Sequence, residues 1–248
     1  MKKILWGGLI VILLAAVIGY WRVNETRPSG VAGPKAEKLA DKMLEAVNYE
    51  GWDTLTAVKW TFRGQHHYIW DKKRNFVEVR WDENRVLLDP SSLKGLAYTA
   101  GELLGKSRGT ELVNTAWEYF ANDSFWLAAP FKARDPGTRR SVVTGEYGEA
   151  LFVEYTSGGV TPGDGYLWIL DDDGLPIRWK MWVKIIPIGG MEFTWESWSE
   201  YTNQVKLSSK RQGILPLEIT GIETSNRLED LHPGEDPFKA LEAELKKE

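Results

Sequence analysis

Apolar and polar residues alternate along much of this chain, which is the period of a β-strand. From Leu55 to Ala100 apolar residues recur at every second position, and short polar runs of hairpin length interrupt them. Alternate residues of a strand point to opposite faces of a sheet, so this spacing gives each strand one apolar face. The pattern predicts an antiparallel meander of about five strands.

A second group of about six strands is predicted later in the chain. Their patterns cover residues 141–145, 150–156, 165–170, 177–186, 192–201 and 217–222. Apolar residues have helical spacing in three segments: from Pro34 to Asn48, from Thr110 to Phe120, and in the tail after Asp236. The stretch from Asn122 to Lys132 has no clear period, and we expect it to be irregular.

These elements predict an α+β fold that is mostly β. Parallel strands need long crossover connections, and the predicted connections are short, so the sheet is expected to be antiparallel. A sheet of about eleven strands tends to curl. We therefore expect one large curved antiparallel sheet, a half-barrel, with helices on its concave side.

The N-terminus has the pattern of a membrane anchor. Lys2 and Lys3 precede an uncharged apolar run over residues 4–21, which approaches the length that crosses a bilayer. The division predicted is a signal anchor or transmembrane helix at 1–22, a linker at 23–34 and a domain at 35–248. The N-terminus is then cytoplasmic and the domain extracytoplasmic, on a single-pass protein of the cell membrane. The alternative is a cleaved signal peptide and a secreted domain, although Val17–Gly19 makes a poor cleavage site.

Composition excludes several classes of function. The chain has no cysteine, which rules out disulfides, thiolate metal sites, cysteine nucleophiles and a lipid attached to cysteine. The formal net charge is −4, with acidic and basic residues mixed, and this argues against a nucleic-acid partner.

Thirteen tryptophans are the most unusual feature of the composition. Several lie on both faces of predicted strands, and apolar residues on both faces require a cover on both. A core of aromatic side chains is one interpretation. The other is a cavity for an apolar guest, with the candidate ligand-binding residues Trp126, Phe131, Trp168, Trp179, Trp182, Trp195 and Trp198.

Polar motifs predict no catalytic residue, metal site or cofactor. His66 and His67 are neighbours on a strand, so they point to opposite faces and cannot readily bind one ion. Asp171–Gly174 fits a hairpin turn better than a calcium loop, and Gly158–Gly165 lacks the lysine and helix of a phosphate loop. Asn122, Asp123 and Lys132 are interpreted as a buried polar network or as the lid of a binding site.

Two segments resemble those of an uncharacterised exported bacterial family. They are Phe120–Leu127 and Gly158–Trp168. The order of elements also resembles that of the lipoprotein-localisation carrier superfamily, which implies a half-barrel whose hydrophobic cavity shields acyl chains. No functional residue of the carriers matches a position here. The carriers are soluble or lipid-anchored, so a peptide anchor departs from their pattern.

The resulting hypothesis is a membrane-anchored, extracytoplasmic binding module for a hydrophobic or amphipathic ligand, such as a lipid or acylated molecule, without catalysis. Its partners are the membrane, through residues 4–21, and that ligand. Two alternatives stay open. One is an envelope hydrolase acting on glycan or lipid through Asp123, Asp164 or the strand glutamates Glu154, Glu196 and Glu200. The other is a structural protein of envelope assembly.

Overall fold

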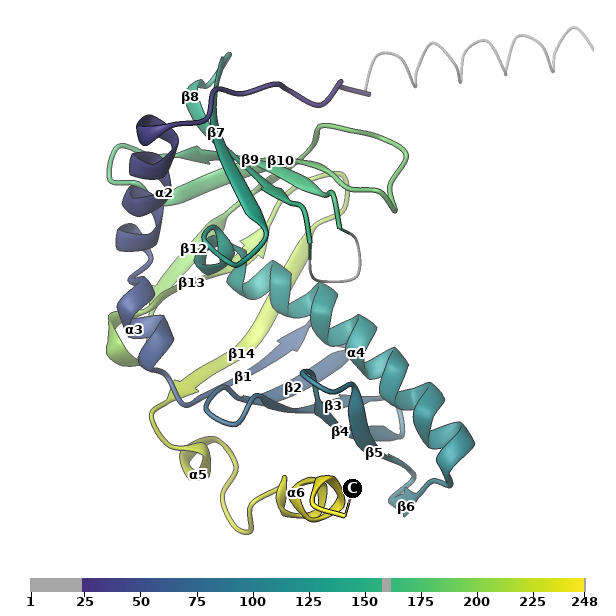
Figure 1. Cartoon of the computed structure of the whole chain (residues 1–248). Coiled ribbons are helices and arrows are strands. Elements are labelled where there is room, and N and C mark those ends of the chain that lie inside the picture. The colour runs from purple at the N-terminus through teal and green to yellow at the C-terminus, as the bar shows by residue number, and fades with distance from the viewer. Residues whose placement is uncertain (1–23, 158–161, 248) are drawn as a thin grey trace, which may run out of the picture.

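The computed structural model describes residues 24–157 and 162–247. In these residues the chain has an α+β fold that is mostly β, with two open antiparallel sheets (Figure 1). The predicted fold class is confirmed, but the prediction of one sheet of about eleven strands is wrong. The sheets have nine and five strands.

The nine-stranded sheet is the predicted meander, extended along one edge by three strands from late in the chain. In spatial order it contains β12 (Glu196–Glu200), β13 (Lys206–Arg211), β14 (Leu217–Ser225), β1 (Ala57–Phe62), β2 (His66–Asp71), β3 (Phe76–Trp81), β4 (Asn84–Asp89), β5 (Lys94–Thr99) and β6 (Glu102–Leu103). β14 pairs with β1, with Thr224 opposite Val58. This pairing joins the last strand of the chain to the first.

The five-stranded sheet packs at one end of the molecule. In spatial order it contains β11 (Met191–Thr194), β10 (Pro176–Trp182), β9 (Gly165–Leu170), β8 (Gly148–Tyr155) and β7 (Thr138–Gly145). The strand predicted at 192–201 is interrupted at Trp195. β11, before that residue, belongs to the five-stranded sheet, and β12, after it, belongs to the nine-stranded sheet. The structure therefore has two sheets where the sequence pattern predicted one.

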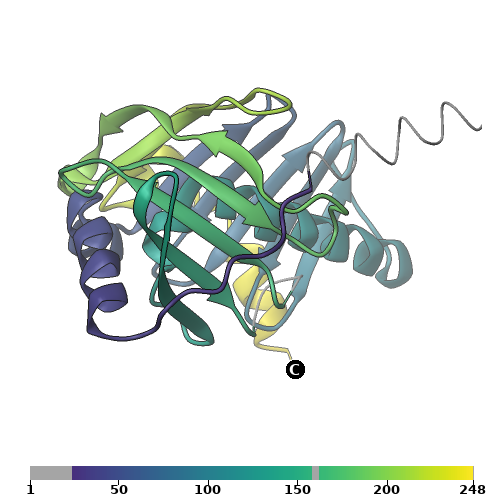
Figure 2. The same cartoon turned by 90° about the horizontal axis from the view of Figure 1, so that it is seen from above.

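Helices cover both faces of the nine-stranded sheet, so the prediction of helices on the concave side alone is wrong. α4 (Lys106–Ala128) crosses one face, whereas α5 (Leu228–Leu231) and α6 (Lys239–Leu245) lie on the opposite face (Figures 1 and 2). α2 (Pro34–Ala46) packs against the five-stranded sheet. The short helices are α3 (Tyr49–Thr54), η1 (Ala129–Lys132) and η2 (Thr202–Gln204).

α4 is longer than the sequence pattern predicts. It begins at Lys106 rather than at Thr110, whose hydroxyl donates back to the Lys106 carbonyl. It also continues through Asn122, Asp123 and Ser124, which were expected to be irregular. Such residues disfavour helices because their side chains compete for nearby backbone groups. Here the side chain of Asp123 is occupied by partners on β2, as described below, and does not compete.

The described residues contain no helix that is both long and apolar enough to cross a bilayer. The predicted anchor, residues 1–22, lies outside the described part of the chain. Residues 24–31, predicted to be part of a linker, run along the outer face of the five-stranded sheet. Val31 forms an antiparallel bridge with Val142 of β7, and the Arg27 guanidinium lies 5.2 Å from the centre of the Phe152 ring.

Candidate functional site

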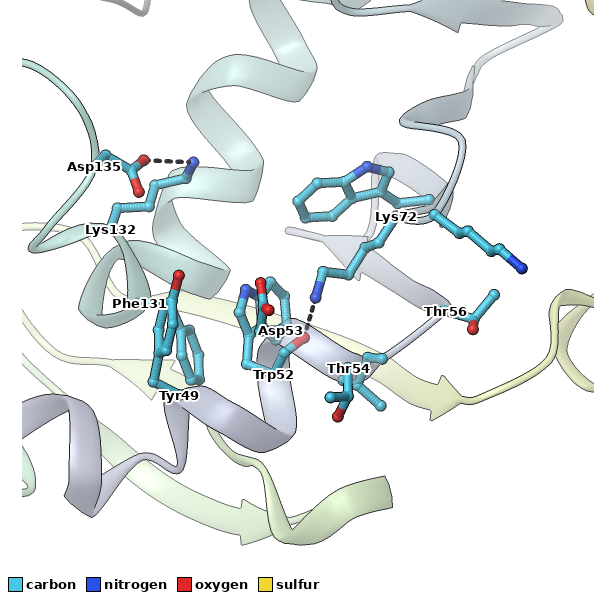
Figure 3. A pocket seen from close by; sticks show the side chains of 12 residues that line it. Tyr49, Trp52, Asp53, Thr54, Thr56, Lys72, Phe131, Lys132 and Asp135 are labelled. Atoms are coloured by element: carbon cyan, nitrogen blue, oxygen red, sulfur yellow. Dashed lines mark hydrogen bonds and ion pairs between the residues drawn. The ribbon is translucent and has the colours of Figure 1, made fainter.

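A cleft of about 460 Å³ opens between α3, the turn that follows β2, and η1 (Figure 3). This volume falls within the range of about 300–1,000 Å³ that is usual for small-molecule sites. The cleft is lined by Tyr49, Trp52, Asp53, Thr54, Leu55, Thr56, Trp70, Lys72, Lys73, Phe131, Lys132 and Asp135. Segments far apart in the sequence therefore build one hollow.

The position of α3 depends on side chains at its first turn. Asn48 adopts a left-handed conformation at the N-cap, and its Oδ1 accepts from the Gly51 N–H at 3.1 Å. The Asn48 amide also donates to the Asn203 carbonyl of η2 at 2.8 Å. Asn203 in turn donates to the Thr54 hydroxyl at 3.0 Å. These bonds hold α3 against η2 and so hold Trp52 and Asp53 at the cleft.

Gly51 makes this close approach possible, and its substitution is the first test of the site. A Cβ at this position would lie 2.3 Å from the Asn203 carbonyl oxygen. Gly51→Ala is expected to push α3 away from η2 and to cost about 1–3 kcal/mol of unfolding free energy. Denaturant unfolding measures this loss of unfolding free energy. In Gly145→Ala, the control, the new Cβ meets no atom within 4 Å. Equal stabilities of the two variants would contradict this account of α3.

The floor of the cleft is aromatic. Trp52 stacks on Phe131 with ring centres 4.6 Å apart and meets Trp70 edge-on at 6.0 Å. Trp70 in turn packs against Phe120 of α4 at 5.3 Å. Trp52 is 7% exposed, so most of its ring area is already covered by protein. The floor is thus fixed and joined to the main core, and Trp70 is its partly exposed ring.

Lys72 is the most unusual charged group in the cleft. Its ammonium donates to the carbonyl of Trp52 and lies 4.2 Å from the centre of the Trp52 ring. Burial lowers the pKa of Lys72 to about 8; Asp53 opposes this shift and Lys132 adds to it. Burial acts in this direction because it disfavours the charged form of a lysine.

Other charges surround the mouth of the cleft. Lys132 lies 3.4 Å from Asp135, a weak ion pair between partly exposed groups. Burial raises the pKa of Tyr49, and the carboxylates of Asp53 and Asp135 raise it further. The cleft thus carries two carboxylates together with the ammonium groups of three lysines. The arrangement places ammonium groups and an aromatic floor together, which suits an anion attached to an apolar body.

Of the seven ligand-binding residues predicted from sequence, one lies in this cleft and one borders a smaller hollow. Phe131 lines the cleft. Trp182 lines a hollow of about 190 Å³ beneath the N-terminal segment, and its indole N–H donates to the Glu25 carbonyl at 2.9 Å. Trp126, Trp168, Trp179, Trp195 and Trp198 line neither of these two hollows.

These five tryptophans pack ring against ring between the sheets. Trp168, Trp179 and Trp195 form a triangle with centres 5.0–5.1 Å apart. Trp126 contacts Trp179 at 5.0 Å, and Trp198 stacks on Trp195 at 5.8 Å. The sequence pattern required a cover on both faces of these strands. Helices α2 and α4 with η1 supply the inner cover, and residues 24–31 supply part of the outer one.

Asp123 belongs to a buried network of β2 and α4, one of the two interpretations of its polar segment. Its carboxylate accepts from the Tyr68 hydroxyl at 2.6 Å and from the Asn122 amide at 2.8 Å, and it lies 2.7 Å from His66 Nδ1. Burial, followed by the Asp123 carboxylate, raises the pKa of Tyr68. Lys132 contacts Asp135 instead and does not join the network.

The carboxylates proposed for hydrolysis do not meet in either hollow. Asp123 is engaged by Tyr68 and His66, whereas Asp164 accepts from the Lys184 N–H at 3.0 Å. Glu196 accepts from the Thr194 hydroxyl at 2.7 Å. None of these three residues lines the cleft. His66 and His67 contact Asp123 and Thr61 respectively, on opposite faces of β2 as predicted.

Sequence reasoning did not identify Trp52, Trp70, Lys72 or Asp53 as site residues. Lys72 was correctly placed in a hairpin turn, where an exposed lysine is ordinary. Trp52 and Asp53 precede the first strand and gave no periodic signal. The sequence offered one signal for this site, which was an aromatic residue on each side of the Thr54–Thr56 segment. Aromatic residues occur both in binding sites and in hydrophobic cores, so this signal does not distinguish the two.

Comparisons with known proteins add little. No family model matches the sequence, and no curated protein matches it. A crystal structure of a DUF1329 family protein from Desulfovibrio piger is similar over 82% of this chain and 95% of that chain, at 8% sequence identity and a TM-score of 0.43. A similarity at this level supports no statement about function.

Proposed function

We propose that this chain is a membrane-anchored, extracytoplasmic binding module without catalytic activity, and that its cleft holds an amphipathic ligand with an anionic head group. The observation that carries the proposal is the half-buried Lys72 ammonium above the Trp52 ring. The anchor is proposed from the apolar run at residues 4–21.

Lys72 weakens the fold unless something binds it. Burial of an ammonium costs free energy, and the lowered pKa of Lys72 is the measure of that cost. Groups that are unfavourable for stability and lie in a hollow are frequently functional. A phosphate or carboxylate bound beside Lys72 and Lys132 would give the Lys72 ammonium a negatively charged partner. It would also offer a hydrogen-bond acceptor to both lysines.

The aromatic floor accounts for the apolar part of the proposed ligand. Trp70 is the partly exposed ring that an acyl chain or ring can contact, and Trp52 and Phe131 support it from beneath. Burying apolar ligand area there contributes roughly 25 cal/mol per Å² before the costs of association. The head group would then fix the orientation of the ligand, and the floor would supply contact area.

The proposal is tested by identifying what the protein carries. Full-length chain is purified in a neutral detergent, extracted with organic solvent, and the extract is compared by mass spectrometry with the bulk lipid. The wild type and Lys38→Met are expected to be enriched in an anionic amphiphile that Lys72→Met lacks. Lys38 is the matched control because it is an exposed lysine of α2. Identical extracts from all three proteins would contradict the proposal.

A further inference from the structure

The first residues that the structure describes are bound tightly to one loop. The Glu25 N–H donates to the Gly189 carbonyl at 3.0 Å, and the Gly189 N–H donates to the Asn24 side chain at 2.8 Å. The Trp182 indole donates to the Glu25 carbonyl at 2.9 Å. A Cβ on Gly189 would lie 2.5 Å from both the Glu25 carbonyl and the Trp182 ring. The segment and the loop therefore form one packed unit.

This loop, residues 183–190 between β10 and β11, is unusually apolar for a surface connection. Its middle reads Lys184-Ile185-Ile186-Pro187-Ile188. Ile185 is 72% exposed although a large aliphatic side chain gains free energy from burial. Single exposed apolar residues are common on protein surfaces. Ile186 packs against the core between the sheets and Ile188 is half-buried, so Ile185 is the isoleucine that this loop exposes, and it lies beside the point where the chain enters the fold.

The chain outside the structure limits where this loop can be. Only two residues, Arg22 and Val23, separate the apolar run that ends at Trp21 from Asn24. Consecutive residues span at most about 3.6 Å each, so Asn24 lies within roughly 11 Å of Trp21. Each polar interface of a bilayer is itself about 5–8 Å thick. If residues 4–21 cross the membrane, Asn24 and the loop bonded to it are held at the membrane surface.

We propose that the loop at residues 183–190 inserts Ile185 into the outer interfacial layer of the bilayer in which the chain is anchored. This inference rests on the anchor of the proposed function and not on ligand binding in the cleft. Ile185 gains apolar contact with acyl chains. Lys184, which is exposed, lies beside lipid phosphates.

Insertion gives the domain a fixed orientation. The bonds from Asn24 and Glu25 to Gly189 and Trp182 hold the point where the chain enters the domain beside the inserted loop. The five-stranded sheet then lies near the membrane. β6, which carries Leu103 at the far edge of the nine-stranded sheet, points away from the N-terminal segment (Figure 1).

The test uses the absence of native cysteine. Ile185→Cys, Lys184→Cys and Leu103→Cys each give a single labelling site in the full-length chain. Leu103 is the matched control because it is an apolar residue that is 60% exposed. Each variant carries an environment-sensitive fluorophore and is reconstituted in phosphatidylglycerol-containing vesicles. Phospholipids with a nitroxide near the head group then quench it.

Labels at 185 and 184 are expected to be quenched roughly threefold more than the label at 103. Equal quenching at all three sites, or stronger quenching at 103, overturns the inference. A full-length chain that does not float with the vesicles overturns both the anchor and the inference. Ligand binding in the cleft is measured separately, so a failure of loop insertion is distinguished from a failure of ligand binding.

Discussion

Replacing Lys72 by methionine is expected to weaken the binding of an anionic amphiphile by about tenfold to a hundredfold. This range corresponds to the roughly 1.5–3 kcal/mol that a hydrogen bond to a charged group contributes. Methionine keeps most of the apolar stem that packs over Trp52 but has no ammonium. The change therefore removes the head-group contact and leaves the aromatic floor in place.

The same substitution is expected to stabilise the fold at neutral pH. The pKa of Lys72 is lowered to about 8 by burial, below its ordinary value of 10.5. Between these two values the unfolded chain binds more protons at Lys72 than the folded chain does, so wild-type stability rises with pH there. The advantage of Lys72→Met is therefore full below pH 8 and disappears near pH 10.5.

Denaturant unfolding from neutral to alkaline pH measures this effect. The expected gain is about 1 kcal/mol at neutral pH, because water screens the exposed part of the side chain and the exchange also loses the bond to the Trp52 carbonyl and the contact with the Trp52 ring. Lys38→Met serves as the control and is expected to match the wild type. A destabilised Lys72→Met at neutral pH, or a gain that grows with pH, would contradict the account.

Replacing Arg211 by alanine is expected to cost about 2–5 kcal/mol of unfolding free energy, because it leaves a cavity and a carbonyl without its donor. Arg211 is fully buried at the end of β13, and burial lowers its pKa. It donates to the Trp126 carbonyl at 2.8 Å, in the last turn of α4. The residue four positions later is Pro130, which has no N–H, so the helix cannot supply this bond itself.

Arg211 also lies between the two sheets and connects them. Its guanidinium is 3.5 Å from the centre of the Trp195 ring, at the point where the chain passes from β11 to β12. Further bonds go to the Ser208 hydroxyl and the Lys210 carbonyl. The negative end of the α4 dipole favours a cation at this place. Alanine would remove these contacts together and leave a cavity.

Two further variants separate the causes of that loss. Arg211→Met fills most of the volume but provides no donor, and is expected to cost about 1–3 kcal/mol. Lys210→Ala, at the exposed neighbouring position, is expected to stay within about 0.5 kcal/mol of the wild type. Urea unfolding distinguishes them. The assignment of Arg211 is contradicted if its alanine variant unfolds at the same urea concentration as Lys210→Ala.

Local sequence pattern was sufficient to predict most strands but not their division into sheets. Alternation over β1 to β5 and the polar turns between them predicted the meander correctly. By contrast, the pattern over residues 192–201 predicted one strand although its alternation breaks at Ser197, and the chain leaves one sheet at Trp195. β13 was missed because Ser208, Ser209 and Lys210 are polar, and its position between β12 and β14 makes it a strand.

The candidate site was less predictable for a related reason. Phe131 was predicted to contact ligand, and the cleft includes it, but Lys72 gave the pattern of an ordinary turn. Its burial arises only when α3 folds over that turn, through bonds of Asn48 and Asn203 that join residues far apart in sequence. Five of the six predicted tryptophans pack in the core between the sheets instead, because composition alone cannot show what covers a strand face.

Calorimetric titration with dodecyl phosphate, below its micelle-forming concentration, tests the central claim most directly. The account predicts saturable binding at one site by the wild type and by Lys38→Met, at least about tenfold weaker binding by Lys72→Met, and little binding of the uncharged dodecyl glucoside. Equal affinity of the wild type and Lys72→Met for dodecyl phosphate would contradict it.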